Sequence, residues 1–190
     1  MTESINPYKA PKSDLKTEQH LGSSESYFFT ASTLKLVLMS VCTLGLYELY
    51  WFYKNWVLIK NREDSTIMPV WRTIFAPFWG FVAFEVVKKA AVERNIKTNL
   101  SAGWLGLAYL LISIVANGPD PIWLISTFSF VPLMLFNSLA IEVAASVDPS
   151  YKQNDNFSPW NVLAIVLGGI LMILLVVTTL YVDVLDEIPL

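Results

Sequence analysis

The sequence predicts an all-α membrane protein, a polytopic bundle of about five transmembrane helices with a disordered polar N-terminal tail. Of its 190 residues, 54% are hydrophobic and only 15% are charged. A soluble domain carries about 25% charged residues, because its surface must face water. Long apolar runs fill the chain after the tail, and they do not alternate with the period of two that a strand requires. Helices are therefore the elements that can satisfy the backbone of these runs in lipid.

The tail, residues 1–30, mixes acidic and basic side chains and has no apolar core typical of a signal peptide. It holds too little apolar surface to offset its conformational entropy, so we expect it to be disordered. The transmembrane helical domain is predicted to cover residues 31–186.

Spanning a hydrocarbon core of about 30 Å takes about 20 helical residues. The last two apolar runs meet this requirement directly, and the third meets it with its uncharged flanks. The first needs residues 54–59 as well, and the second is marginal because Pro77 and Glu85 interrupt it. A turn at Asn117–Asp120 should place the third and fourth runs in an antiparallel hairpin. The runs are Leu36–Tyr53, Thr73–Val87, Leu100–Asn117, Ile122–Ile141 and Val162–Val182.

Basic residues near the ends of spans favour the cytoplasm, and this bias sets the orientation. We favour five full spans with the N-terminus in the cytoplasm and the C-terminus outside, in a bacterial inner membrane. This topology leaves four basic residues on the outer side. If the first two runs instead enter the membrane and return, with bends at Thr43–Gly45 and Ala76–Pro77, all 13 basic residues lie inside. The four basic residues that five full spans would leave on the outer side are Lys54, Lys60, Arg62 and Arg72.

Pairs of small residues four apart predict close contacts between helices, because they let two backbones approach. Three such pairs occur: Ala102 and Gly106, Ala140 and Ala144, and Ala164 and Gly168.

One carboxylate in the first run is a candidate functional residue. Glu48 has apolar and aromatic neighbours on both sides, and an acidic side chain inside a membrane is costly enough to suggest a proton- or cation-binding role. We expect it to form an intramembrane polar site with Thr43, Tyr47 and Tyr50, whose hydroxyls can donate hydrogen bonds.

The same stretch carries a family resemblance. Its pattern is T-x-G-[IL]-Y-x-x-Y-W-x-Y-K, which resembles an uncharacterised bacterial membrane family named domain of unknown function 4234. The resemblance implies a bacterial inner-membrane location. It does not indicate an activity, because the family has no assigned function. An alternative interpretation of the aromatic residues is an interfacial belt that ends at a lysine. The matching residues are Thr43, Gly45, Tyr47, Tyr50, Trp51, Tyr53 and Lys54.

A basic segment follows the second run. It is either the positive-inside signal itself or a contact surface for anionic lipid head groups, where each basic residue contributes about 1 kcal/mol. The four residues are Lys88, Lys89, Arg94 and Lys97. The net charge of −3 argues against a nucleic-acid partner.

No catalytic constellation is visible. The one histidine, His20, lies in the tail, and the chain has no zinc-protease, CxxC or phosphate-loop motif. We therefore expect a non-enzymatic protein without cofactor or metal, which acts through membrane lipids, a protein partner or a second copy of itself. The alternative is a small transporter or channel subunit that uses Glu48.

Overall fold

The structure, a computed structural model, describes residues 26–186, and it describes side chains from Ser26 to Tyr181. Every regular element in this part of the chain is helical, as predicted. The predicted disorder of the tail falls mainly on residues 1–25, outside the described residues. The elements are α2 (Thr33–Cys42), α3 (Leu46–Glu63), α4 (Pro69–Ile74), α5 (Ala76–Glu93), α6 (Ala102–Ile114), η1 (Val115–Asn117), η2 (Ile122–Phe128), α7 (Phe130–Val147) and α8 (Pro159–Asp186).

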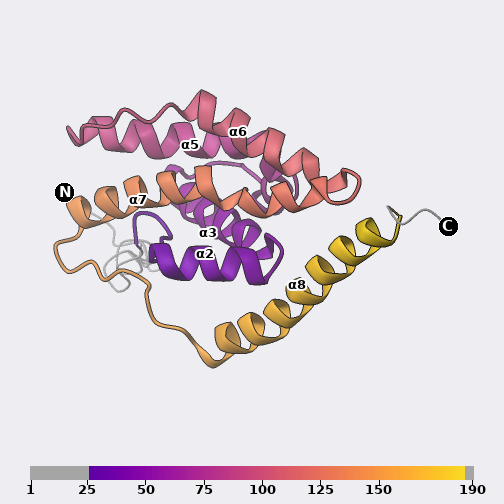
Figure 1. Ribbon diagram of the computed structural model, residues 1–190. Helices are drawn as coiled ribbons and strands as arrows, with labels where there is room; N and C mark the ends of the chain where they lie inside the picture. The colour runs from indigo at the N-terminus through magenta and orange to yellow at the C-terminus, as the bar shows by residue number, and fades with distance from the viewer. Residues whose placement is uncertain (1–25, 187–190) are drawn as a thin grey trace, which may run out of the picture.

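The first apolar run folds back on itself as α2 and α3 (Figure 1). The two helices are separated at Leu44 and Gly45, whose φ angles are 52° and 84°. Glycine adopts this left-handed backbone at little steric cost, so a helix ends there readily. Arg62, near the end of α3, donates a hydrogen bond of 2.8 Å to the carbonyl of Tyr27, which shortly precedes α2. The bend at Thr43–Gly45 that the alternative topology requires is therefore present, and the start of α2 and the end of α3 lie at the same end of the bundle.

The second run behaves similarly as α4 and α5. The helix breaks at Phe75, and Pro77 lies in the first turn of α5. The guanidinium of Arg72 lies 4.5 Å from the ring centroids of both Trp56 and Trp79, which places α4 against the middle of α3. At the end of α5, the guanidinium of Arg94 lies 4.3 Å from the ring centroid of Tyr27. We call this end of the bundle, where Tyr27, Arg62, Arg94 and the loop 148–158 gather, the basic end.

The expectation of five full spans is not supported. Within residues 26–186, two helices are long and apolar enough to cross a membrane, Ile122–Val147 and Pro159–Tyr181. Since α2 has 10 residues and α4 only 6, neither reaches the about 20 that a crossing takes. Both runs instead break between two helices, and α3 and α5 both end at the basic end. This arrangement agrees with the alternative in which the first two runs enter and return.

The third and fourth runs form the predicted antiparallel hairpin. In Figure 1, α6 leads away from the basic end and α7 returns beneath it. The turn between them brings η1 against η2. Aromatic rings join α7 to the rest of the bundle: Phe136 stacks on Phe84 of α5 at 4.2 Å with an angle of 5° between the rings. Phe84 in turn packs on Phe52 of α3, and both contact Tyr109 of α6.

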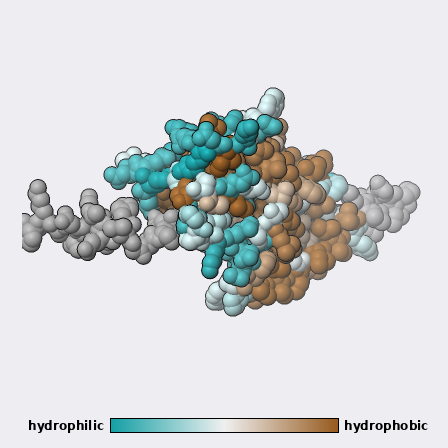
Figure 2. Space-filling model, turned by 90° about the vertical axis from the view of Figure 1, so that its left-hand side faces the viewer, coloured by the Kyte–Doolittle hydropathy of each residue, from teal (hydrophilic) through white to brown (hydrophobic). Residues whose placement is uncertain are grey.

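The last helix, α8, lies on the outside of the bundle and contacts mainly α2 (Figure 1). Only 6% of its apolar window is buried, so leucine, isoleucine and valine side chains cover most of its open surface. Such a surface exceeds what a monomeric soluble protein exposes. It indicates a membrane location, and Figure 2 shows hydrophilic residues gathered in one region beside an extended hydrophobic surface.

Two of the predicted small-residue pairs lie at helix contacts. A Cβ atom added at Gly168 of α8 would overlap the carbonyl oxygen of Cys42 in α2. A Cβ atom at Gly106 of α6 would lie 2.6 Å from the Phe81 ring of α5. Ala164 packs against the buried core, and Ala140 and Ala144 are buried in α7.

Candidate functional site

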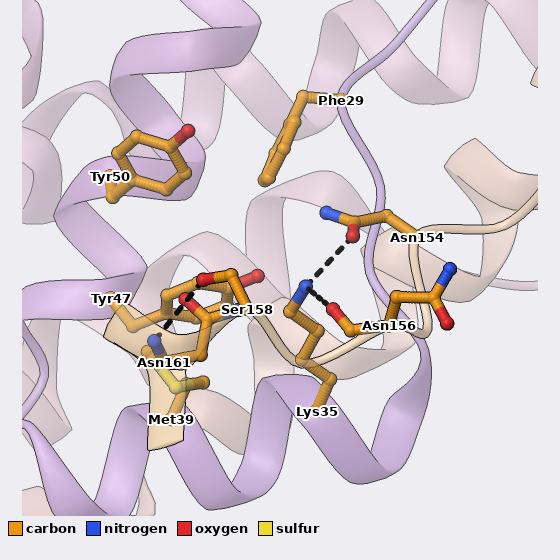
Figure 3. Close-up of a pocket in the computed structure, with 9 residues that line it drawn as sticks. All are labelled: Phe29, Lys35, Met39, Tyr47, Tyr50, Asn154, Asn156, Ser158 and Asn161. Carbon is orange, nitrogen blue, oxygen red and sulfur yellow. Dashed lines mark hydrogen bonds between the residues drawn. The ribbon is translucent and has the colours of Figure 1, made fainter. Parts of the chain in front are cut away.

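A cavity of about 410 Å³ opens at the basic end, between α2, α3, the loop 148–158 and the start of α8 (Figure 3). We call it the Lys35 pocket. Its lining is mostly polar, and it holds no carboxylate. The lining residues are Phe29, Lys35, Met39, Tyr47, Tyr50, Asn154, Asn156, Ser158 and Asn161.

Two buried asparagines fix the extended segment that forms one wall of this pocket. Asn55 of α3 accepts a hydrogen bond from the amide of Phe29 (3.1 Å) and donates one to its carbonyl (2.9 Å). Asn137 of α7 pairs with Ala31 in the same way, at 3.0 Å and 2.7 Å. Side-chain amides thus replace a neighbouring strand, and they satisfy backbone groups that would otherwise be buried without partners. Residues 26–30, the end of the predicted disordered tail, are therefore held in place, and Phe28 is fully buried.

Lys35 supplies the positive charge of the pocket. It is only 4% exposed, and its ammonium group donates hydrogen bonds to Asn154 Oδ1 (2.8 Å) and to the carbonyl of Asn156 (2.7 Å). No carboxylate in the described part of the chain forms an ion pair with it within 4.0 Å. The charge of Asp155 acts on it from a greater distance. A buried cation held by neutral oxygens leaves a net positive charge in the pocket.

Tyr47 supplies an unsatisfied hydroxyl. The residue is 6% exposed, and its hydroxyl has no hydrogen-bond partner among the described residues. Figure 3 shows Tyr47 and Lys35 reaching into the same space from α3 and α2. A buried polar group without a partner is uncommon and requires an explanation.

Glu48 lies on a different face of α3. It is 2% exposed, and its Oε1 accepts a hydrogen bond of 2.8 Å from the hydroxyl of Ser129. The Tyr109 hydroxyl of α6 also contacts the carboxylate. No ion pair reaches Glu48 within the part of the chain that the structure describes. Two hydroxyl groups, one from Ser129 just before α7 and one from Tyr109 of α6, thus contact a buried acid in the first turn of α3.

The predicted polar site is therefore divided. Because successive helical residues point about 100° apart, Tyr47 and Tyr50 face the Lys35 pocket while Glu48 faces Ser129. The Thr43 hydroxyl donates a hydrogen bond to the carbonyl of Met39 (2.6 Å) and accepts one from the amide of Tyr47 (3.0 Å). It therefore bonds to the nearby backbone. None of these three residues bonds to Glu48 in the structure.

The residues that match the family pattern lie in different parts of the structure. Gly45 forms the bend, and Tyr47 and Tyr50 line the pocket. Trp51 is buried and donates its indole N–H to Asn137 Oδ1 (3.0 Å). Tyr53 is 39% exposed, and Lys54 is half-buried. The motif thus supplies both a wall of the pocket and a contact with α7.

The predicted lipid-contact segment is only partly exposed. Arg94 stacks on Tyr27 and donates a hydrogen bond to the carbonyl of Ala90 (2.9 Å). Arg62 covers the same tyrosine ring at 4.0 Å, so both arginines stabilise the fold. Lys89 and Lys97 are exposed and Lys88 is half-buried, which leaves the lysines to interact with solvent or lipid.

Lys35, Asn55 and Asn137 are functional residues that the sequence patterns do not predict. Asn137 interrupts an otherwise apolar run, and this was the available signal, since a polar amide in an apolar helix needs partners.

Among residues 26–186, no group of three or more His, Cys, Asp or Glu side chains could hold a metal ion. Comparison with models of protein families, with curated proteins and with solved structures gives no match.

Proposed function

We propose that the protein is a multi-pass inner-membrane protein that acts without catalysis, through contact with membrane lipid or a partner protein at its basic end. The observation that carries this proposal is the difference between the two ends of the bundle. Arg62, Arg94 and Lys35 lie at one end with the loop 148–158. The opposite end, formed by residues 43–46 and 115–129, has no lysine or arginine. Positive charge concentrated at one end is typical of the cytoplasmic side.

The proposed topology follows from this difference. The N-terminus and the basic end lie in the cytoplasm, and the segments 33–63 and 69–93 enter the membrane and return. The shorter apolar segment Ala102–Asn117 leads to the outer side, Ile122–Val147 returns to the cytoplasm, and Pro159–Tyr181 crosses last, so the C-terminus lies outside. The resemblance of Thr43–Lys54 to the bacterial membrane family supports the same location.

A lipid-composition experiment tests the proposed role. The full chain is excised from bacterial membranes in polymer-bounded particles, and the lipids around it are measured by mass spectrometry. We expect anionic lipids to be enriched several-fold over the bulk membrane. Replacing Lys88, Lys89 and Lys97 by glutamine should lower this enrichment severalfold, because each lysine contributes about 1 kcal/mol of attraction near an anionic surface.

The control changes three charges elsewhere. Lys9, Lys12 and Lys16 lie in a stretch with Glu3, Asp14 and Glu18, so their replacement by glutamine should have a smaller effect. Equal lipid composition around the wild type and in the bulk membrane would contradict the lipid role. A stoichiometric protein that co-purifies in place of enriched lipid would favour a partner.

Glu48 supports a second candidate, a small transporter or channel subunit. A carboxylate that lies deep in the bundle with two hydroxyl contacts could hold a proton or a cation. This candidate has less support, because Glu48 does not line the Lys35 pocket. Ion flux in reconstituted vesicles that disappears in Glu48→Ala would favour it, and flux that persists unchanged in Glu48→Gln would count against it.

A further inference from the structure

The Lys35 pocket presents hydrogen-bond donors. Two of the three ammonium protons of Lys35 are used by Asn154 and Asn156, and the third remains. The Tyr47 hydroxyl is buried and has no partner within the described residues. Ser158 accepts from the amide of Asn161 (3.2 Å), which leaves its own proton to donate. These groups suit an oxyanion, which only accepts hydrogen bonds.

The start of α8 adds to this preference. Ser158 caps a helix of 28 residues, and Asn161 in its first turn lines the pocket. The N-terminal end of a helix carries a partial positive charge, which favours anions. With Lys35 on the opposite wall and no carboxylate in the lining, the electrostatics of the pocket favour a negatively charged ligand. Asp155 is the acidic side chain whose charge reaches Lys35, and it does not line the pocket.

An apolar groove of about 470 Å³ follows the pocket along the same helices. On each of these two helices, the groove begins about one helical turn further along the chain than the pocket. On α2 it begins at Cys42, after Met39, and on α8 it begins at Ala164, after Asn161. Leu46, Leu167 and Leu171 contribute to its lining. The polar pocket and the apolar groove therefore follow each other along α2 and α8, in the direction that leads from the basic end towards the opposite end of the bundle.

From this order we infer that the Lys35 pocket binds the phosphoester head group of an anionic membrane lipid, with an acyl chain of that lipid in the groove between α2 and α8. The inference rests on the proposed function, since it places the basic end at the cytoplasmic leaflet. The phosphate oxygens accept hydrogen bonds from Lys35, Tyr47 and the Ser158 hydroxyl. The cavity volume is in the range of ligand sites, and the sequence of polar and apolar surface matches that of a lipid at the membrane boundary.

A titration of the purified full chain in mild detergent tests this inference. Short-chain phosphatidylglycerol is the probe, and binding is measured by calorimetry. Tyr47→Phe keeps the ring and removes the hydroxyl, so we expect about a tenfold loss of affinity, as for a hydrogen bond to a charged group. Tyr53→Phe, an exposed tyrosine on the same helix that does not line the pocket, should bind as the wild type does. Lys35→Gln should also lose binding, but Lys35 holds the loop, so Tyr47→Phe is the decisive variant.

Two further probes separate the sources of the phosphate. Short-chain phosphatidylcholine is neutral and should bind at least about tenfold more weakly, because Lys35 repels its ammonium group. Glycerol 3-phosphate has no acyl chain and should also bind at least about tenfold more weakly, because it leaves the groove empty of apolar contact. Equal affinities of Tyr47→Phe and wild type would overturn the inference, as would equal binding of phosphatidylcholine. Binding of glycerol 3-phosphate as tight as that of the lipid would overturn the lipid assignment.

The titration and the lipid-enrichment experiment can fail separately, so they distinguish the pocket inference from the proposed function. If Tyr47→Phe binds the probe normally while the lysine variant loses enrichment, the pocket inference fails and the proposed function stands. If the pocket binds the probe specifically but the bulk enrichment is absent, the general lipid role of the lysines fails.

Discussion

Replacing Asn137 by leucine should destabilise the protein by about 3–5 kcal/mol. Leucine has nearly the same size, but it removes the partner of two buried groups, the N–H of Ala31 and the indole N–H of Trp51. It also leaves the Ala31 carbonyl with one longer hydrogen bond, from Gln153 Nε2 at 3.5 Å. Each buried polar group left without a partner costs about 1–3 kcal/mol. The expected result is a large fall in the unfolding temperature of the purified protein, followed by tryptophan fluorescence in detergent.

The neighbouring position provides the control. Ser138 is exposed, and its hydroxyl bonds only to the Met134 carbonyl of its own helix (3.1 Å). Ser138→Ala should therefore change the unfolding temperature little. An Asn137→Leu protein as stable as the wild type would mean that the segment around Ala31 is not held as the structure describes.

Replacing Gly168 by alanine should separate α8 from α2. The added methyl group would overlap the backbone carbonyl oxygen of Cys42, and a backbone atom cannot move aside as a flexible side chain can. Overpacking of this kind costs about 1–3 kcal/mol. We expect faster proteolysis in the loop 148–158, because Lys35 and α8 both hold that loop, together with a lower unfolding temperature.

The adjacent glycine is a matched control. A Cβ atom at Gly169 would lie 3.7 Å from Cys42 Sγ, an ordinary van der Waals contact. Gly169→Ala should therefore behave like the wild type. If both alanine variants resist proteolysis equally, the close crossing of α2 and α8 is contradicted.

The helical class and the close contacts at Gly106 and Gly168 could be predicted from the sequence, and the bend at Thr43–Gly45 was part of the alternative topology. These features depend on local signals: apolar length, a glycine between two helical segments, and small residues four apart. The number of spans could not, because an apolar run of sufficient length is consistent with a crossing and with a return. A return becomes apparent only through contacts such as that between Arg62 and Tyr27, which are 35 residues apart and bring the end of α3 to the start of α2.

The candidate site depends on still longer contacts. Glu48 was identified by its surroundings in sequence, but its partner Ser129 is 81 residues away, and no local pattern connects them. Nothing near Lys35 in the sequence distinguishes it from the other lysines that precede the first run. Its burial depends on Asn154 and Asn156 of a loop more than a hundred positions later. Tyr47 and Tyr50 were assigned to the correct helix, but their direction could not be read without knowing which face of α3 meets α7.

The most direct test of this account is the topology of the first two runs. Single cysteines are placed at Asn61, Lys152 and Asp120, all of them exposed, and labelled in intact cells with a reagent that does not cross the membrane. In this account Asn61→Cys and Lys152→Cys are protected and react only after the membrane is opened, whereas Asp120→Cys reacts from outside. Labelling of Asn61→Cys from outside, with Lys152→Cys protected, would show that the first run crosses the membrane and would contradict the account.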